Sequence, residues 1–160
     1  MNLDGFALPV KKLQGTDPVE TLDLSGKNLG VASAVVIASL ICVNGGLTSL
    51  DLSNNALCGR TSNGGTYTAD GITAIADALR INGGLTSINL SGNQLCGIWT
   101  DWRGQHGTYT AEGITAIADA LRVNGALTEC SLQYNPCIGE EGEALIRKAV
   151  QGKAGFKLRI

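Results

Sequence analysis

The chain has 160 residues, of which 44% are hydrophobic, so it can bury the core of one domain and its composition argues against disorder. Its net charge is −2 and no basic run is longer than a pair such as Lys11 and Lys12, which excludes the clustered cations that nucleic-acid binding requires. No apolar stretch approaches the roughly 18 residues of a membrane span. We therefore expect neither a nucleic-acid partner nor a membrane partner.

Residues 1–18 are expected to form an N-terminal capping segment with apolar side chains such as Phe6, Leu8 and Leu13. The lysines of this segment follow its first apolar residues, which reverses the order found in a secretory signal peptide. A cytoplasmic location is therefore expected.

The first predicted helix, VASAVVIASLICV over residues 31–43, is apolar on nearly every side. A helix of this kind is normally buried, and residues 1–18 are the expected cover. A partner protein could cover it instead. A second copy of the chain could also do so, and the protein would then be a weak homo-oligomer.

A repeated pattern, LxxLxLxxNxL, runs through the chain from residue 19 onward. Its first segment has Lys27 at the ninth position and Asn28 one position later, and its fourth replaces two leucines by Cys130 and Cys137. The repeats start at residues 19, 47, 85 and 127, with the segments VETLDLSGKNL, LTSLDLSNNAL, LTSINLSGNQL and LTECSLQYNPC.

The pattern predicts a short strand followed by a sharp exit from it. Leucines at the first, fourth and sixth positions place apolar side chains on one face of the strand. An asparagine side chain can then bond to backbone groups where the strand ends, and successive asparagines can form a ladder. The expected structural asparagines are Asn28, Asn55, Asn93 and Asn135.

Two later helices are predicted by nearly identical sequences, because residues 65–80 and 107–122 differ only in Asp70 against Glu112. Apolar residues recur in each at helical spacing. Thr68 and Thr110 are the expected N-caps. The expected left-handed helix stops are Asn82–Gly83 and Asn124–Gly125.

With these segments the chain resembles leucine-rich repeat proteins of the ribonuclease-inhibitor-like type over residues 19–160. The resemblance implies an α/β solenoid shaped as a horseshoe segment, with a parallel concave sheet and convex helices. It implies four full repeats and a truncated fifth strand over residues 156–160. It also implies that the chain binds another protein through its concave face and rim loops and carries out no chemistry.

Two insertions interrupt the repeat, since the four starts lie 28, 38 and 42 residues apart. The longer units carry enlarged strand-to-helix loops over residues 58–70 and 96–112. Neighbouring strands lie about 4.8 Å apart, so both loops should emerge side by side on one rim, with Tyr67 beside Tyr109.

These rim loops gather aromatic and arginine residues, which is the composition of interface anchors. The tryptophans could alternatively form a small core of the loop itself. The expected partner-binding residues on the rim are Arg60, Tyr67, Trp99, Trp102, Arg103, His106 and Tyr109.

The exposed face of the sheet is expected to be small, rich in hydroxyls and mildly acidic. In the last strand Lys157 and Arg159 should point outward and discourage pairing between sheet edges. The expected partner-binding residues on the concave face are Asp23, Asp51, Asn89, Glu129, Ser131 and Tyr134.

Catalytic chemistry is not predicted. His106 is the single histidine, and a Cys96–His106 pair lacks a residue to orient the histidine. Phosphate-binding glycine loops and zinc-ligand spacings are absent from the sequence, so no catalytic residue, metal or cofactor is expected. Five cysteines are most simply reduced core residues, although the equivalent positions of Cys58 and Cys96 would also permit a disulfide.

The sequence therefore predicts a non-catalytic module that binds a partner protein through the concave face and the enlarged loops. One alternative is a self-associating structural element or a fragment of a larger repeat scaffold. Another is a small-ligand or metal site on the insertion that holds Asp101, Arg103 and His106.

Overall fold

A five-stranded parallel sheet organises the fold. The computed structural model describes residues 1–59, 65–136 and 138–160, so Arg60 and Cys137 lie outside the described residues. Every strand of this sheet pairs in parallel with its neighbour, which confirms the predicted α/β class with a parallel sheet. In spatial order the strands are β3 (Thr21–Asp23), β4 (Ser49–Asp51), β5 (Ser87–Asn89), β8 (Glu129–Ser131) and β9 (Lys157–Arg159).

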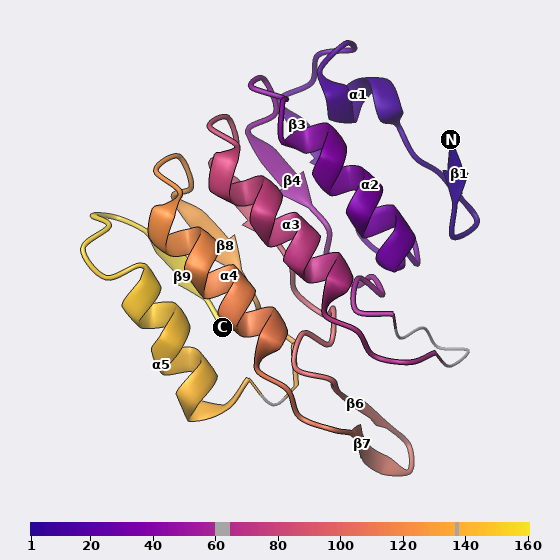
Figure 1. Cartoon of the computed structure of the whole chain (residues 1–160), viewed down its shortest axis with the longest axis vertical. Helices are drawn as coiled ribbons and strands as arrows, with labels where there is room; N and C mark the ends of the chain where they lie inside the picture. The colour runs from indigo at the N-terminus through magenta and orange to yellow at the C-terminus, as the bar shows by residue number, and fades with distance from the viewer. Residues whose placement is uncertain (60–64, 137) are drawn as a thin grey trace.

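The helices lie side by side and cover one face of this sheet (Figure 1). Each follows a strand, and no helix in the described part of the chain combines the length and apolar character that a membrane crossing requires. They are α2 (Val31–Ile41), α3 (Asp70–Ile81), α4 (Glu112–Val123) and α5 (Gly139–Ala149).

The core lies between the helices and the sheet. The central residues of the strands stand in register, so that Leu50 faces Leu22 on one side and Ile88 on the other. Leu50 and Ile88 are each 1% exposed. The leucine positions of the sequence pattern are therefore the positions that stack across the sheet.

The N-terminal segment contacts α2 near both of its ends. It contains an antiparallel pair, β1 (Asn2–Leu3) and β2 (Phe6–Ala7), followed by the short helix α1 (Val10–Gln14). Asp4, in the turn between β1 and β2, accepts hydrogen bonds from the Gly30 amide at 2.8 Å and the Ser33 hydroxyl at 2.5 Å. Asp4 thereby supplies an acceptor to the N-terminal end of α2, whose own N-cap residue is a glycine.

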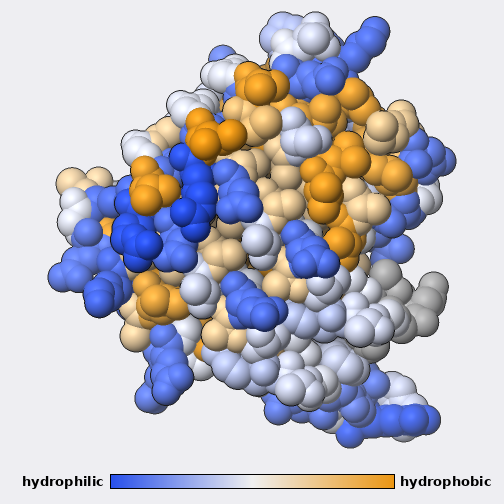
Figure 2. Space-filling view, in the orientation of Figure 1, coloured by the Kyte–Doolittle hydropathy of each residue, from blue (hydrophilic) through white to orange (hydrophobic). Residues whose placement is uncertain are grey.

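The cover over α2 is partial. Leu8 and Leu13 are buried, but Val35 is 45% exposed and Val43 is 75% exposed. Figure 2 shows apolar surface gathered over α2. The expectation that residues 1–18 bury this helix is therefore wrong for its outer side, because the segment contacts the two ends of α2 and the neighbouring core.

A ladder of buried asparagines joins the turns that follow the strands. The Asn55 side chain donates to the carbonyls of Leu24 and Leu52 and accepts from the Leu29 amide. Asn93 and Asn135 repeat this pattern one and two turns further along the sheet. The predicted ladder is confirmed for these asparagines.

Asn28 does not belong to this ladder, so its assignment as a structural asparagine is wrong. It is exposed and has a left-handed backbone with φ of 58°. The position equivalent to Asn55 is held by Lys27, and the Lys27 amide instead donates to the Asn55 side chain. The turn after β3 therefore receives its hydrogen-bond acceptor from Asn55, in the turn after β4.

The predicted helix ends also need correction. Asn82 and Asn124 adopt extended backbones, not left-handed ones. Their side chains form a second ladder with Asn44: the Asn82 amide group donates to the Asn44 carbonyl, and that of Asn124 donates to the Asn82 carbonyl, each at 3.0 Å. These asparagines connect the turns between helices and strands instead of ending helices by left-handed geometry.

The N-caps of the two related helices lie one residue later than expected. They are Ala69 and Ala111, while Thr68 and Thr110 precede them. The threonine hydroxyls still accept hydrogen bonds from the first helical amides, those of Asp70 and Glu112. Each threonine thus serves the helix start from just outside it.

We predict that Asn93→Ala lowers the free energy of unfolding by about 3 kcal/mol, because several buried carbonyls and an amide lose their partner. The measurement is urea denaturation followed by circular dichroism. The matched control is Asn28→Gly, which keeps a left-handed conformation at an exposed site and should change the stability by less than about 1 kcal/mol. Equal losses in both variants would contradict the ladder as a source of stability.

Candidate functional site

The two insertions close on themselves in the same way. The Cys58 carbonyl accepts from the Thr68 amide and the Cys96 carbonyl accepts from the Thr110 amide, both at 3.0 Å. The glycine after each cysteine has positive φ, 84° at Gly59 and 74° at Gly97. A side chain there would also meet the backbone of the returning strand of the loop. The shared sequence GTYT is therefore the closing segment of each insertion.

The second insertion is a β-hairpin, which corrects the expectation of a loop. Strands β6 (Ile98–Asp101) and β7 (Gly104–Gly107) pair antiparallel and project beyond the ends of the helices (Figure 1). At the tip, the Asp101 carboxylate accepts from the Arg103 amide at 2.7 Å. The hairpin thus has a regular backbone of its own.

The two tryptophans of the hairpin differ in their surroundings. The Trp99 ring is half-buried, stacks on His106 with ring centres 5.7 Å apart, and lies over Gly107, where any Cβ would overlap it. Trp102 is 85% exposed, and the Arg103 guanidinium lies 4.4 Å from the centre of its ring. Trp99 therefore belongs to the hairpin's packing, whereas Trp102 is displayed to solvent.

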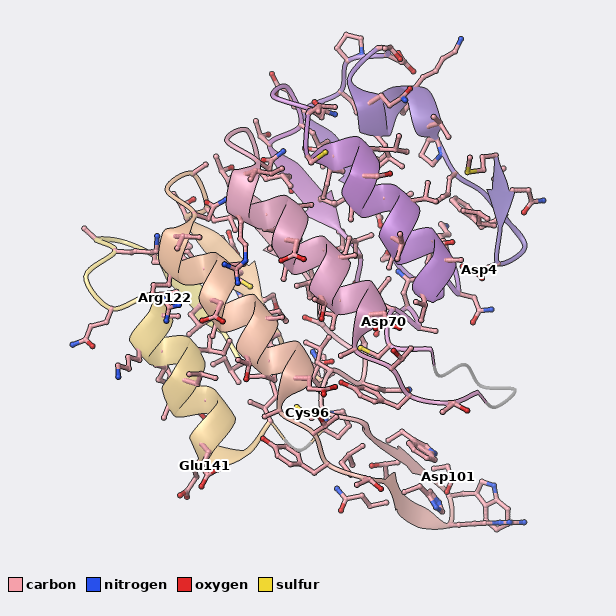
Figure 3. The ribbon with its side chains drawn as sticks, viewed as in Figure 1. Asp4, Asp70, Cys96, Asp101, Arg122 and Glu141 are labelled. Atoms are coloured by element: carbon pink, nitrogen blue, oxygen red, sulfur yellow. The ribbon has the colours of Figure 1, made fainter. Side chains whose placement is uncertain are left out.

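His106 contacts Asp101 across the hairpin, with Nε2 and Oδ1 2.9 Å apart. The pKa of Asp101 is lowered, first by the Arg103 amide and then by the His106 side chain. Because folding lowers the pKa of Asp101, these contacts stabilise the hairpin at a pH above the ordinary pKa of an aspartate. This stabilisation is lost as the pH falls through the lowered pKa. Figure 3 shows Asp101 far out on the hairpin and Cys96 at its root.

A groove separates the closing segments of the two insertions. Its volume is about 570 Å³, and Tyr67, Trp99 and Tyr109 all line it. The two tyrosines therefore share one rim, as the spacing of the repeats predicts. The Tyr67 hydroxyl donates to the Leu95 carbonyl at 3.0 Å, and burial is the main cause that raises the Tyr67 pKa. Tyr109 is 46% exposed.

Two acidic residues of this groove are not among the predicted site residues. Asp70 and Glu112, the first residues of α3 and α4, line it from equivalent positions. A signal is present in the sequence, because a carboxylate follows the tyrosine by three residues in both copies. Taken within one repeat, that carboxylate indicates only a favourable charge at a helix start.

The sheet face carries a second, smaller hollow of about 300 Å³. It is lined by most of the residues predicted for the concave face: Asp51, Asn89, Glu129, Ser131 and Tyr134. Asp23 is exposed on the edge strand but does not line the hollow. The predicted face is therefore brought together except at its first strand.

Several of these polar groups already bond within the chain. The Asn89 amide group donates to Asp51, and Glu129 pairs with Arg159 at 2.9 Å. Ser131 lines the hollow but is only 8% exposed, and its hydroxyl lies 2.9 Å from that of Ser91. Tyr134 is 82% exposed and has a left-handed backbone with φ of 55°. Tyr134 is thus the prominent displayed side chain of this face.

Cys58, Cys96 and Cys130 are buried in the core. Burial raises the pKa of the Cys58 thiol and of the Cys130 thiol to about 12 in each case. Since Cys58 is a thiol, the disulfide between Cys58 and Cys96 that the sequence permitted is not formed. A buried Cys96 is also not placed to attack a substrate with help from His106, whose ring faces Trp99 and Asp101.

A metal site on the insertions would need a third ligand beside Asp101 and His106. Over residues 1–59, 65–136 and 138–160, no three histidine, cysteine or acidic side chains are grouped closely enough to hold a metal ion. The described part of the hairpin therefore brings together Asp101 and His106 without a third potential metal ligand.

Comparisons with known proteins support a protein of the leucine-rich repeat type. The family model "Leucine Rich Repeat" matches residues 46–65. The solved structure of Leiomodin-1 Actin-Binding Site 2 is 23% identical, with a TM-score of 0.68 over 94% of this chain and 76% of the other. The tropomodulin C-terminal domain of Caenorhabditis elegans is 10% identical, with a TM-score of 0.49 over 89% of each chain. No curated protein matches the sequence.

We predict that iodoacetamide modifies Cys42, which is half-buried, before Cys58 or Cys130 in the native protein at mildly alkaline pH. With a pKa of about 12, fewer than about one in a thousand of the buried thiols would be ionised there. Peptide mass spectrometry gives the modified fraction at each cysteine, and the same treatment in guanidinium chloride is the control. Native labelling of Cys58 at the rate of Cys42 would contradict the buried assignment.

Proposed function

We propose that this chain is a non-catalytic protein-interaction module that binds a partner protein through the rim of its insertions and the adjoining sheet face. The observation that carries the proposal is the tip of the hairpin, where Trp102 is 85% exposed with Arg103 stacked over its ring. A large apolar ring left in water is unfavourable unless a partner covers it. Tryptophan and arginine are also the residues that most often dominate the binding energy of interfaces.

The backbone beneath this tip is already ordered. Four cross-strand pairs join β6 to β7, and the stacked rings of Trp99 and His106 brace the hairpin. A partner that binds Trp102 would therefore not need to order the loop, which lowers the entropic cost of association. This pre-organisation favours a docking role over a loop that only connects two elements.

The sheet face supplies the second half of the proposed interface. Its hollow is lined by partly exposed polar groups from neighbouring strands and by the exposed Tyr134. The proposed contacts on this face are Asp23, Asp51, Asn89, Glu129 and Tyr134, and those on the rim are Tyr67, Trp102, Arg103 and Tyr109.

The fold likeness is consistent with this class of function. The similar region of leiomodin-1 is an actin-binding site, and so a site for another protein. For the present chain we propose that the partner is a protein and that the chain itself catalyses no reaction. We further propose a ribonuclease-inhibitor-like horseshoe of four repeats over residues 19–160 with a truncated fifth strand, a capping segment over residues 1–18, and a cytoplasmic location.

We predict that Trp102→Ala reduces capture of the partner from a lysate of the source organism by about 30-fold in affinity, the loss expected for an interface hot spot. Quantitative mass spectrometry of proteins retained by the wild-type and variant chains is the measurement. Val123→Ala is the matched control, because Val123 is 56% exposed and is the last residue of α4, at the opposite ends of the helices. Both variants should melt near the wild-type temperature, and equal retention by all three chains would refute the hairpin tip as part of the interface.

Self-association through α2 is a second candidate, favoured by the exposed Val35 and Val43. A groove of about 330 Å³ between α2 and α3 adjoins Val35 on this outer face. A second copy covering this face would remove apolar surface from water.

If the chain self-associates through α2, Val35→Ser should lower the average mass measured by light scattering at high protein concentration. Val123→Ser, at an exposed site on α4, should leave that mass unchanged. A wild-type chain that stays monomeric at every concentration would rule this candidate out.

A further inference from the structure

The groove between the two closing segments has walls that are already rigid. The Tyr67 ring is held by its hydroxyl bond to Leu95, and the Trp99 ring by His106 and Gly107. Tyr109 completes the aromatic lining with a ring that is 46% exposed. Rings fixed before binding lose little side-chain entropy when a ligand packs on them. The volume of about 570 Å³ falls within the usual range of ligand pockets.

The same groove is anionic. Asp70 and Glu112 line it, both residues are exposed, and neither takes part in an ion pair among the residues that the structure describes. A further carboxylate lies close by, because the charge of Glu141 contributes, after burial and Cys96, to raising the pKa of Tyr109. Figure 3 shows Asp70 at the start of α3, above the hairpin that carries Asp101.

Aromatic faces and carboxylates share one kind of ligand. A lysine or arginine side chain is attracted by the negative face of an aromatic ring and by a carboxylate. An extended proline-containing segment adds compact apolar rings that pack on tyrosine and tryptophan, and its backbone is stiff before it binds. A neutral apolar ligand would leave Asp70 and Glu112 with only the partial positive charge of the two helix starts.

We propose that this groove binds an extended, proline-containing segment of the partner protein, with a lysine or arginine seated between the aromatic rings and the carboxylates of Asp70 and Glu112. This inference rests on the proposed function and assigns the chemistry of one part of the interface. Trp102 lies at the hairpin tip and does not line the groove, so the two parts can be tested separately.

The experiment measures fluorescence anisotropy of a labelled heptapeptide, capped at both ends, whose central arginine is flanked by prolines. Titration with the full chain should give saturable binding, at least about tenfold tighter than for the same peptide with glutamate in place of arginine. Added salt should weaken the binding, because part of it is electrostatic. Absence of saturable binding, or equal binding of both peptides, would overturn the inference.

Variants locate the binding in the groove. Tyr109→Ala and the double variant Asp70→Asn/Glu112→Gln should each weaken binding of the arginine peptide by about tenfold. The control Asp77→Asn/Glu140→Gln removes two exposed carboxylates outside the groove and should bind as the wild type does. Melting curves identify a variant that unfolds, in which case the single variant Glu112→Gln provides the comparison. Equal loss in the control would assign the effect to net charge and overturn the groove as the site.

The outcome for the groove is distinguishable from that for the whole interface. If the peptide does not bind but Trp102→Ala still abolishes capture of the partner, the groove inference fails and the proposed function stands. If peptide binding meets all its controls while Trp102→Ala captures the partner normally, the hairpin tip is not part of the interface.

Discussion

The structure depends on satisfying the backbone groups that become buried when parallel strands are stacked close together. Each strand is only three residues long, so most of the polar backbone between one strand and the next lies in turns. Buried asparagines bond to those turns at both ends of the strands: Asn55, Asn93 and Asn135 at one end, and Asn44, Asn82 and Asn124 at the other. Without these side chains, buried carbonyls and amides would lack partners at a cost of about 1–3 kcal/mol each.

This arrangement also explains how two insertions are tolerated. Each one leaves the fold after a strand and returns before a helix, and a hydrogen bond between the cysteine carbonyl and the threonine amide closes its root. The asparagine ladders lie outside the closed loops, so added length does not disturb them. The insertions are therefore free to carry surface chemistry, and the second has done so with a hairpin that displays Trp102.

The near identity of residues 65–80 and 107–122 has a physical counterpart in the rim. Both copies close a loop with GTYT, start a helix, and place a tyrosine and a carboxylate on the same groove. One copy alone would provide only one wall. Two neighbouring copies in parallel register provide facing walls, which makes the groove a property of the pair.

Sequence periodicity alone determined the parallel α/β class, the strand positions, the buried leucines, the ladder of Asn55, Asn93 and Asn135, and the common rim of the insertions. These follow from local spacing, because side-chain alternation in a strand and the period of a helix set which residues face inward. The same reasoning misassigned Asn28 and the helix ends at Asn82 and Asn124. The conformations of Asn82 and Asn124 are set by hydrogen bonds to a neighbouring turn in space, which lies about 40 residues away in the sequence.

Only the tertiary structure decided which aromatic side chains are displayed. Trp99 and Trp102 are three residues apart in one insertion, yet the first packs on His106 and the second is exposed. Cross-strand pairing in the hairpin makes this difference, because it sets His106 opposite Trp99 and leaves Trp102 in the turn. The groove with Asp70 and Glu112 likewise arises from the packing of two distant segments, and spacing within either segment does not reveal it.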